Sequence, residues 1–345
     1  MRSSHPHVPA VLACVFAASA AFDFSVPTPP SPVAIDGRDW LIYELHLTNF
    51  SRGPLRLTRL DVLAGGTKVL QSFAGDELAQ RVADVGETVV VYLEIPVSTQ
   101  HPPRLLRHRV RYATDDGREV DEVVGGEVRL RPRTRLELDP PLRGGPWVAV
   151  YAWQWPRGHR RVFYTLDGRA RLPGRFAIDW VRQDEQGRTA SGDADIVKNS
   201  LGYGADVLAV ADARVAATRD GITESERVSA NPTHPLDEAA GNYIALELGH
   251  GRFAIYEHLA PGSIRVARGE RVRRGQVLAS LGFTGDSTGP HLHFHVADNP
   301  SPLLGEGLPF EFKRFRLHGA GLPQVRERER PAPNAVVSFD QAAHP

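Results

Sequence analysis

Residues 285–298, GDSTGPHLHFHVAD, carry a histidine at every second position over five residues. His291, His293 and His295 alternate there with apolar residues. Because successive side chains of a β-strand point to opposite faces, this spacing predicts a strand with three imidazoles on one face. Two imidazoles two positions apart lie roughly 6 to 7 Å from each other, from the rise per residue of a strand. The stretch is therefore either a polar strand surface or a metal site, in which one histidine binds the metal and another faces a substrate.

Two further residues have suitable chemistry and lie in apolar, strand-like segments. Asp179, in GRFAIDWV (174–181), stands between two large apolar residues, where an unpaired charge is costly. His258 ends the apolar run FAIYEH (253–258). A catalytic zinc ion takes three protein ligands, often histidine and carboxylate, and leaves a fourth position to water. Both residues are candidates for one site with the histidine strand, and the alternative for Asp179 is a buried carboxylate bonded to the backbone or to an arginine.

The rest of the chain consists of short alternating segments separated by turns. Residues 40–51, WLIYELHLTNFS, alternate in this way, and similar runs follow without a helical period. We expect an Ig-like β-sandwich over residues 40–133. A stretch rich in Pro and Gly separates it from a second β-rich domain over residues 147–322. Long polar loops at 181–202 and 219–241 are expected to border a functional groove there. The predicted fold class is mainly β.

Residues 1–20 have the features of a secretory signal peptide. An apolar run follows a single early arginine, is too short to span a bilayer, and ends in Ala18-Ser19-Ala20. We expect cleavage after Ala20 and hence a secreted or periplasmic protein. A lipoprotein signal at Cys14 is the weaker alternative, because little apolar sequence precedes it. Cys14 is the only cysteine, so the mature chain would contain neither disulfides nor thiol chemistry.

Charge and composition argue against other classes of protein. Lys plus Arg and Asp plus Glu both number 41, so nothing favours nucleic acid or an anionic membrane surface as a partner. No other segment reaches the ~18 apolar residues of a transmembrane helix. The Pro-rich residues 21–39 are expected to form a linker. Residues 323–345, with a charged run followed by Pro331 and Pro333, are expected to form an extended or loosely packed tail.

The residues from 256 to 296 form an ordered block that resembles a known family. The block reads Tyr-x-His-Leu, then Val-x-x-Gly-x-x-Val-x-x-Gly-Gln, then Gly-x-Thr-Gly-x-Ser-Thr-Gly-Pro-His-Leu-His-Phe. Together with GADVLAVADARVAATRDG (204–221), it is similar to the lysostaphin/LytM-type zinc metallopeptidases, which cleave peptide cross-bridges in bacterial cell walls. The resemblance covers about residues 175–300 and leaves out the N-terminal sandwich.

The resemblance implies a role for each matching residue. His293, the second histidine of the His-x-His pair, would be a zinc ligand, and Asp179 would be the carboxylate ligand. His291, the first of the pair, would face the scissile bond. His258 would be its catalytic partner on the substrate side. The resemblance also implies a mechanism, in which Zn²⁺ activates a water molecule and polarises the scissile carbonyl, while the two histidines transfer protons.

The third zinc ligand departs from the commonest pattern of the family. That pattern is His-x-x-x-Asp, and the position four before Asp179 is Arg175, which stays protonated and cannot bind zinc. The nearest upstream histidine is His159, and an Asp167-Gly168 hairpin is expected in between. A hairpin can return its start beside its end, so we expect His159 to be the ligand. The alternative is a site that is one ligand short.

Three other histidines receive no catalytic role. His250 is expected to be structural or on the surface, and His234 to lie in a loop. His295 stands where the family often has a glutamate. It either orients a neighbouring ligand or is a packing or solvent-exposed residue.

These observations predict a secreted zinc metalloendopeptidase that acts on peptidoglycan peptides. The first alternative is a catalytically degenerate LytM-type module that binds the wall or activates another hydrolase. Retention of Asp179, His258, His291 and His293 favours the enzyme. The second alternative is a wall- or carbohydrate-binding protein in which the N-terminal sandwich makes the contact. The sandwich has no evident aromatic platform, so this alternative ranks last.

Overall fold

The computed structural model describes residues 21–340 except 79–81, 115, 116, 118, 134, 153, 154, 156 and 157. The predicted signal sequence, its cleavage site and Cys14 lie outside the described residues. The regular elements of the described chain are β-strands and 3-10 helices of three or four residues, so the mainly β fold class is confirmed. No helix among the described residues has the length and apolar character needed to cross a membrane.

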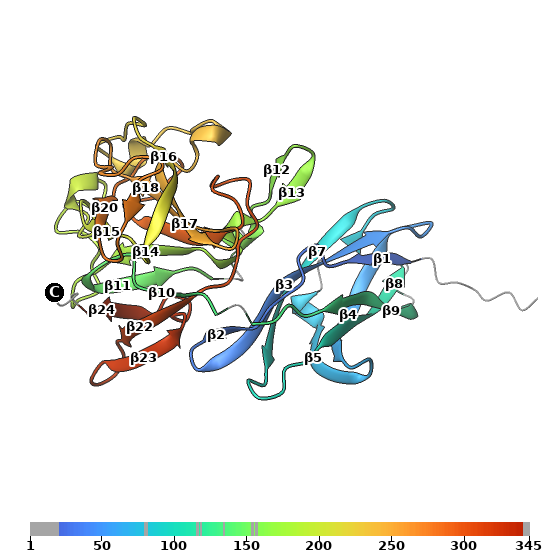
Figure 1. The fold of residues 1–345 in the computed structure, drawn as a ribbon. Coiled ribbons are helices and arrows are strands. Elements are labelled where there is room, and N and C mark those ends of the chain that lie inside the picture. The colour runs from blue at the N-terminus through green and yellow to red at the C-terminus, as the bar shows by residue number, and fades with distance from the viewer. Residues whose placement is uncertain are drawn as a thin grey trace, which may run out of the picture. The chain divides into compact units, whose positions relative to one another are not determined.

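The described residues form two compact units (Figure 1). The first unit comprises the described parts of 1–29, 43–95 and 103–130. Its strands belong to two antiparallel sheets, and the ring of Phe22 on one sheet packs edge-on against Tyr112 on the other at 5.6 Å. One sheet contains β1 (Phe22–Ser25), β3 (Arg38–Asn49) and β7 (Thr88–Val97). The other contains β4 (Leu55–Ala64), β5 (Lys68–Ala74), β6 (Val82–Ala83), β8 (Leu105–Thr114) and β9 (Glu119–Arg129).

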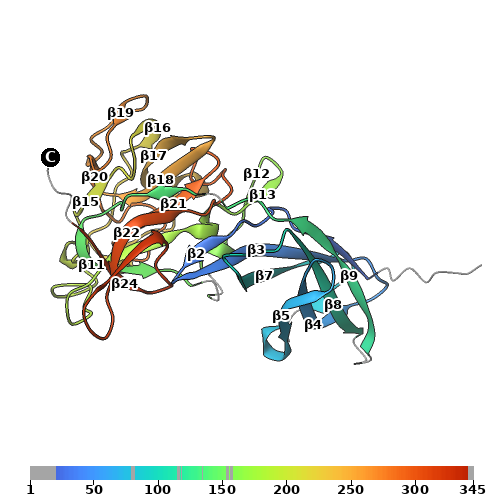
Figure 2. The same ribbon diagram turned by 60° about the horizontal axis from the view of Figure 1, so that its bottom comes forward.

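The second unit is built on one eleven-stranded sheet, with the order β10-β22-β24-β11-β14-β21-β18-β17-β16-β19 and with β23 paired to β22. The strands are β10 (Glu137–Leu138), β11 (Gly144–Val150), β14 (Ile178–Arg182), β16 (Ala213–Arg219), β17 (Asn242–Gly249), β18 (Arg252–Leu259), β19 (Arg271–Val272), β21 (Leu292–Ala297), β22 (Glu311–Leu317), β23 (Gln324–Glu329) and β24 (Val336–Phe339). Figure 2 shows β18 and β21 side by side within this unit. Two small two-stranded sheets accompany it: the hairpin of β12 (Tyr164–Leu166) with β13 (Arg169–Arg171), and the pair of β15 (Asp206–Leu208) with β20 (Val277–Ser280).

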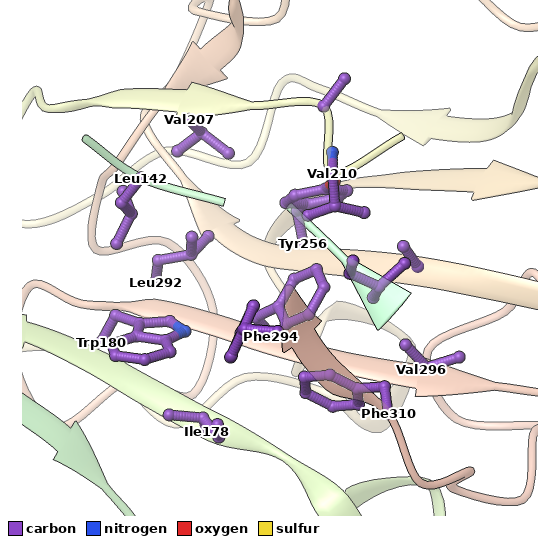
Figure 3. Close-up of a cluster of buried hydrophobic side chains, with 14 of the residues drawn as sticks. Leu142, Ile178, Trp180, Val207, Val210, Tyr256, Leu292, Phe294, Val296 and Phe310 are labelled. Carbon is purple, nitrogen blue, oxygen red and sulfur yellow. The ribbon is translucent and has the colours of Figure 1, made fainter. Parts of the chain in front are cut away.

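The core of the second unit explains the sequence of the histidine strand. Leu292, Phe294 and Val296 are fully buried and pack with Trp180 and Tyr256 (Figure 3). The rings of Phe294 and Tyr256 are 5.1 Å apart and tilted at 62°. Full burial of each such side chain contributes about 1.5–3 kcal/mol. The apolar residues therefore fix which face of β21 is buried, and the histidines between them must occupy the opposite face.

Two segments that were expected to be a linker and a tail contain strands. Within 21–39, the structure has β1 and β2 (Val33–Ile35), and the four prolines lie between these strands, where no ladder hydrogen bond is lost. Asp39 and Glu311 are both buried and bind Arg133 at 2.8 and 2.7 Å, so residues 30–42 belong to the second unit. The boundaries given above for the two domains otherwise stay predictions.

The C-terminal segment forms β23 and β24 rather than a loose tail. Arg and Glu dominate its sequence because β23 is an exposed strand at the edge of the sheet, whereas β24 pairs with both β11 and β22. Phe339 on β24 is buried, with its ring 5.2 Å from that of Trp180 and 6.0 Å from that of Phe312. The last described strand is therefore part of the core.

Phe339→Ala is expected to lower the free energy of unfolding by about 3–5 kcal/mol, because it leaves a cavity beside Trp180. Urea denaturation followed by tryptophan fluorescence measures the change. Val325→Ala on β23 is the control, because Val325 is 43% exposed and its loss is expected to cost less than ~0.5 kcal/mol. Equal stability of the two variants would show that β24 is not part of the core.

Candidate active site

Strand β21 joins the candidate residues on one face of the sheet. It is antiparallel to β14 on one side and to β18 on the other, and His293 is in register with both Asp179 and Glu257. Residues directly opposite each other on paired strands project to the same face. These three side chains therefore lie together on the face opposite the apolar core.

Asp179 is the centre of this group. Its Oδ2 lies 3.1 Å from His159 Nε2, and its Oδ1 lies 2.9 Å from His293 Nδ1 and 3.2 Å from His291 Nε2. Burial by itself would raise the pKa of Asp179, but the charges and hydrogen bonds of His159 and His291 lower it, and the resulting pKa is well below the usual value. The described ion-pair partners of this carboxylate are thus three imidazoles.

The three predicted zinc ligands, His159, Asp179 and His293, offer atoms that all lie within 4.8 Å of one another. His159 begins the short helix η2 (His159–Arg161), and the hairpin β12–β13 then returns the chain to η3 (Pro173–Phe176), just before β14. The two helices touch closely, since a Cβ added at Gly174 would lie 2.8 Å from His159 Cβ. The hairpin thus returns the chain beside His159, as the sequence suggested, and metal binding by these residues stays a prediction.

Arg175 does not compete for this position. Its guanidinium is buried and binds Glu306 Oε2 at 3.0 Å and the Gly307 carbonyl at 3.2 Å. The Arg175 side chain is therefore engaged with Glu306 and Gly307, and it does not take the role of the histidine that the family pattern has at this position.

The two predicted proton carriers, His258 and His291, have defined tautomers. His258 Nδ1 lies 2.7 Å from the Thr284 carbonyl, and His291 Nδ1 lies 2.7 Å from the Gly289 carbonyl. Because a carbonyl can only accept, Nδ1 must carry the proton in both rings. The Nε2 atoms are left for the site, and the ring centroids are 4.8 Å apart.

The surroundings move the pKa values of these two histidines in opposite directions. Burial, followed by the charges of His291 and His293, holds the pKa of His258 well below its usual value, so this ring is neutral. Burial also acts to lower the pKa of His291, but Asp179 outweighs it and the pKa is raised. Such a divergence suits one group that accepts a proton and another that donates one.

The backbone around His258 is unusual for a strand. This residue has φ of +61°, a left-handed conformation that costs a non-glycine residue about 1–2 kcal/mol. The Thr284 carbonyl reaches His258 because glycines line the approach: a Cβ at Gly241 would lie 2.5 Å from that carbonyl oxygen, and one at Gly285 would lie 2.4 Å from Gly241 N. The strain and the close approach together fix the direction of the imidazole.

Comparison with known proteins identifies the domain. Residues 200–303 match the family model described as Peptidase family M23. The chain carries an M23 peptidase domain. The match includes His258, His291 and His293, and it begins after His159 and Asp179 in the sequence. The resemblance to LytM-type peptidases is thereby confirmed.

Several curated proteins are similar to the M23 domain. The chain is 43% identical over 70 residues to the peptidoglycan DD-endopeptidase ShyB of Vibrio cholerae, which covers 20% of this chain and 15% of that protein. It is 35% identical over 126 residues to an uncharacterized metalloprotease of Haemophilus influenzae, which covers 34% and 23%. The chain thus spans less than a quarter of the length of these relatives. Among solved structures, the catalytic domain of lysostaphin from Staphylococcus simulans aligns over 48% of this chain and 88% of that one, with 18% identity and a TM-score of 0.26.

Two hollows of the second unit meet at Asp179. One has a volume of about 270 Å³ and is lined by residues that include His159 and Trp155. The other has a volume of about 260 Å³ and is lined by residues that include His291 and Ala190. Asp179 lines both hollows, so an extended chain could pass over the cluster from one to the other.

Sequence reasoning missed Glu257, which is a member of the same cluster. Its carboxylate is buried, and Oε1 lies 3.3 Å from His295 Nδ1 and 3.8 Å from His293 Nε2. Burial, and then the charge of Asp179, raise the pKa of Glu257 well above its usual value. A glutamate beside a candidate histidine in an apolar run was the available signal. His295, left open between orientation and packing, is buried against this carboxylate.

The remaining histidines lie away from the cluster. His250 is exposed in the turn between β17 and β18, and His234 pairs with Asp286 at 3.3 Å. Neither belongs to a group that could hold a metal among the described residues. The structure thus separates them from the five residues proposed from sequence, which it brings together.

Proposed function

We propose that this chain is a zinc metalloendopeptidase that cleaves peptide bonds in peptidoglycan. The observation that carries the proposal is that a possible ligand trio lies beside two imidazoles, His258 and His291. Their ring centroids are 4.8 Å apart, and both rings use Nδ1 to contact a backbone carbonyl. The M23 domain supports peptide hydrolysis, and relatives named as peptidoglycan DD-endopeptidases support the substrate class. A secreted or periplasmic location fits a wall substrate and stays part of the proposal.

The residues fit zinc by the chemistry of the donor set. His159, Asp179 and His293 supply two imidazole nitrogens and a carboxylate, which are usual zinc ligands, and three protein ligands leave a position open. The Asp179 side chain is 18% exposed, and the described chain gives it no lysine or arginine partner. A largely enclosed carboxylate whose partners are imidazoles lacks a permanent positive charge, which a divalent cation would provide.

Zinc held by these residues would polarise the scissile carbonyl and lower the pKa of water to about 7. His258 is neutral with its proton on Nδ1, so its Nε2 can take the proton that the attacking water loses. His291 Nε2 can donate a hydrogen bond to the oxyanion of the tetrahedral intermediate. The same two groups can return a proton to the leaving amine, and no covalent intermediate with the protein is needed.

The direct test is digestion of purified peptidoglycan by the zinc-loaded protein, with new amino termini quantified and the products identified by mass spectrometry. Cleavage of a peptide bond that ceases with a chelator and resumes with zinc is expected. A protein that holds zinc, binds the wall and releases no peptide would instead favour a non-catalytic binding module. Isolated residues 21–130 that pull down peptidoglycan would assign wall contact to the N-terminal sandwich.

His159→Ala is expected to weaken zinc binding by about 100-fold or more, because the loss of a ligand exceeds the 10- to 100-fold cost of losing a residue that only orients a ligand. Competition with a chromophoric chelator measures the affinity. His234→Ala is the matched control, since that histidine pairs with Asp286 outside the cluster. Unchanged zinc affinity in His159→Ala would refute the ligand assignment.

A further inference from the structure

A second buried group of donors lies on the side of His293 that faces away from Asp179. His293 Nε2 is 3.1 Å from His295 Nδ1 and 3.8 Å from Glu257 Oε1, and His295 Nδ1 is 3.3 Å from the same oxygen. The side chains of these three residues are at most 10% exposed. We call Glu257, His293 and His295 the inner trio.

The nitrogen of His293 that carries the ring proton indicates a role for the inner trio. His293 Nδ1 faces Asp179 at 2.9 Å, so this nitrogen would bind the zinc ion through its lone pair. The ring proton must then reside on Nε2, which becomes a donor. His295 Nδ1, at 3.1 Å, can accept this hydrogen bond, and the Glu257 carboxylate at 3.8 Å adds its charge. The ring would therefore be held in one orientation from behind.

The burial of Glu257 suggests that this carboxylate has a role in the site. A buried carboxylate destabilises the folded protein unless a positive charge or hydrogen-bond donors contact it. An apolar side chain of similar size could fill the same space with a smaller loss of stability. The described ion-pair partners of Glu257 are His293 and His295, which carry no permanent charge. A cation bound to Nδ1 of His293 would provide this positive charge, because the same ring lies between the cation and Glu257.

The local backbone is arranged so that Glu257 can reach this position. Tyr256 faces the core, so Glu257 faces the site, and regular alternation would turn His258 back into the core. The left-handed φ of His258 breaks this alternation. Both Glu257 and His258 consequently contact the histidine cluster.

We propose that Glu257, acting together with His295, is a positioning residue for His293. With zinc bound, His295 Nδ1, 3.1 Å away, would accept the Nε2–H of the ring. The Glu257 carboxylate, 3.8 Å away, would place a negative charge behind the ring, which would raise the affinity of Nδ1 for zinc. The inference rests on the proposed function, because it requires zinc at His159, Asp179 and His293.

The test compares zinc affinity, by chelator competition, and the visible absorption spectrum of the Co²⁺-substituted protein. Glu257→Gln keeps the shape and removes the charge, and we expect zinc affinity to fall by about 10- to 100-fold with a shifted Co²⁺ spectrum. Glu247→Gln on the adjacent strand β17 is the control, because Glu247 is exposed. Glu257→His combined with His295→Glu exchanges the two groups, and we expect it to recover most of the lost affinity.

The outcomes separate this inference from the proposed function. Wild-type zinc affinity in a folded Glu257→Gln variant, or no recovery in the exchange variant, would overturn the positioning role while leaving the peptidase intact. A second equivalent of zinc that disappears in Glu257→Gln would also overturn it, since the inner trio would then be a metal site itself. A wild-type protein that binds no zinc would remove the proposed function. If Glu257→Gln does not fold, the exchange variant and His295→Gln provide the same comparison.

Discussion

Asp179→Asn is expected to abolish stoichiometric zinc binding and to lower kcat/KM on peptidoglycan by about 10³-fold or more. Asparagine keeps the shape of the side chain but removes the charge that faces three imidazoles, two of them proposed ligands. The stabilisation that a metal gives to transition-state charge amounts to several kcal/mol, and each ~1.4 kcal/mol corresponds to a factor of ten. Metal content by elemental analysis and the rate of release of amino termini measure the two effects.

Asp184→Asn is the matched control for this change. Asp184 follows β14 on the same segment, and its carboxylate binds Arg188 at the surface instead of the histidine cluster. We expect this variant to bind one zinc ion and to keep full activity. Full activity of Asp179→Asn with one zinc ion bound would contradict both the ligand assignment and the mechanism derived from it.

Strand periodicity made the histidine face predictable. The apolar residues of β21 decide which face is buried, so the positions of His291, His293 and His295 follow from a spacing of two. The orientation of Asp179 was predictable for the same reason, because a carboxylate between two buried apolar residues must point to the other side of the sheet. The expectation that His159 approaches Asp179 needed a hairpin in between, and β12–β13 is that hairpin.

The features that escaped prediction depend on contacts between distant segments or on broken periodicity. Glu257 lies beside His258, and adjacent strand residues ordinarily face opposite ways, so nothing in the alternation joined them to one cluster. The left-handed backbone at His258 supplies that exception. The burial of Phe339 could not be read from a segment whose charge and prolines indicated a tail, because the edge strand β23 is exposed while the next strand, β24, packs in the core.

His258→Ala is expected to lower kcat by about 10²–10⁴-fold while one zinc ion stays bound, since general acid–base catalysis commonly accounts for that factor. The proposed ligands are untouched by the change. The variant loses only the Nε2 that would accept the proton of the attacking water, held in place by the Thr284 carbonyl. Zinc content, KM and kcat are measured on the same preparation, and the fall should appear in kcat.

The matched control for this variant lies on the same hairpin. His250, between β17 and β18, also has a left-handed backbone, with φ of +54°, but it is exposed and outside the cluster. His250→Ala therefore places alanine in a comparably strained conformation without touching the site. If both variants lose activity equally, backbone strain and not proton transfer explains the effect. If only His258→Ala loses activity and zinc stays bound, the imidazole itself moves the proton.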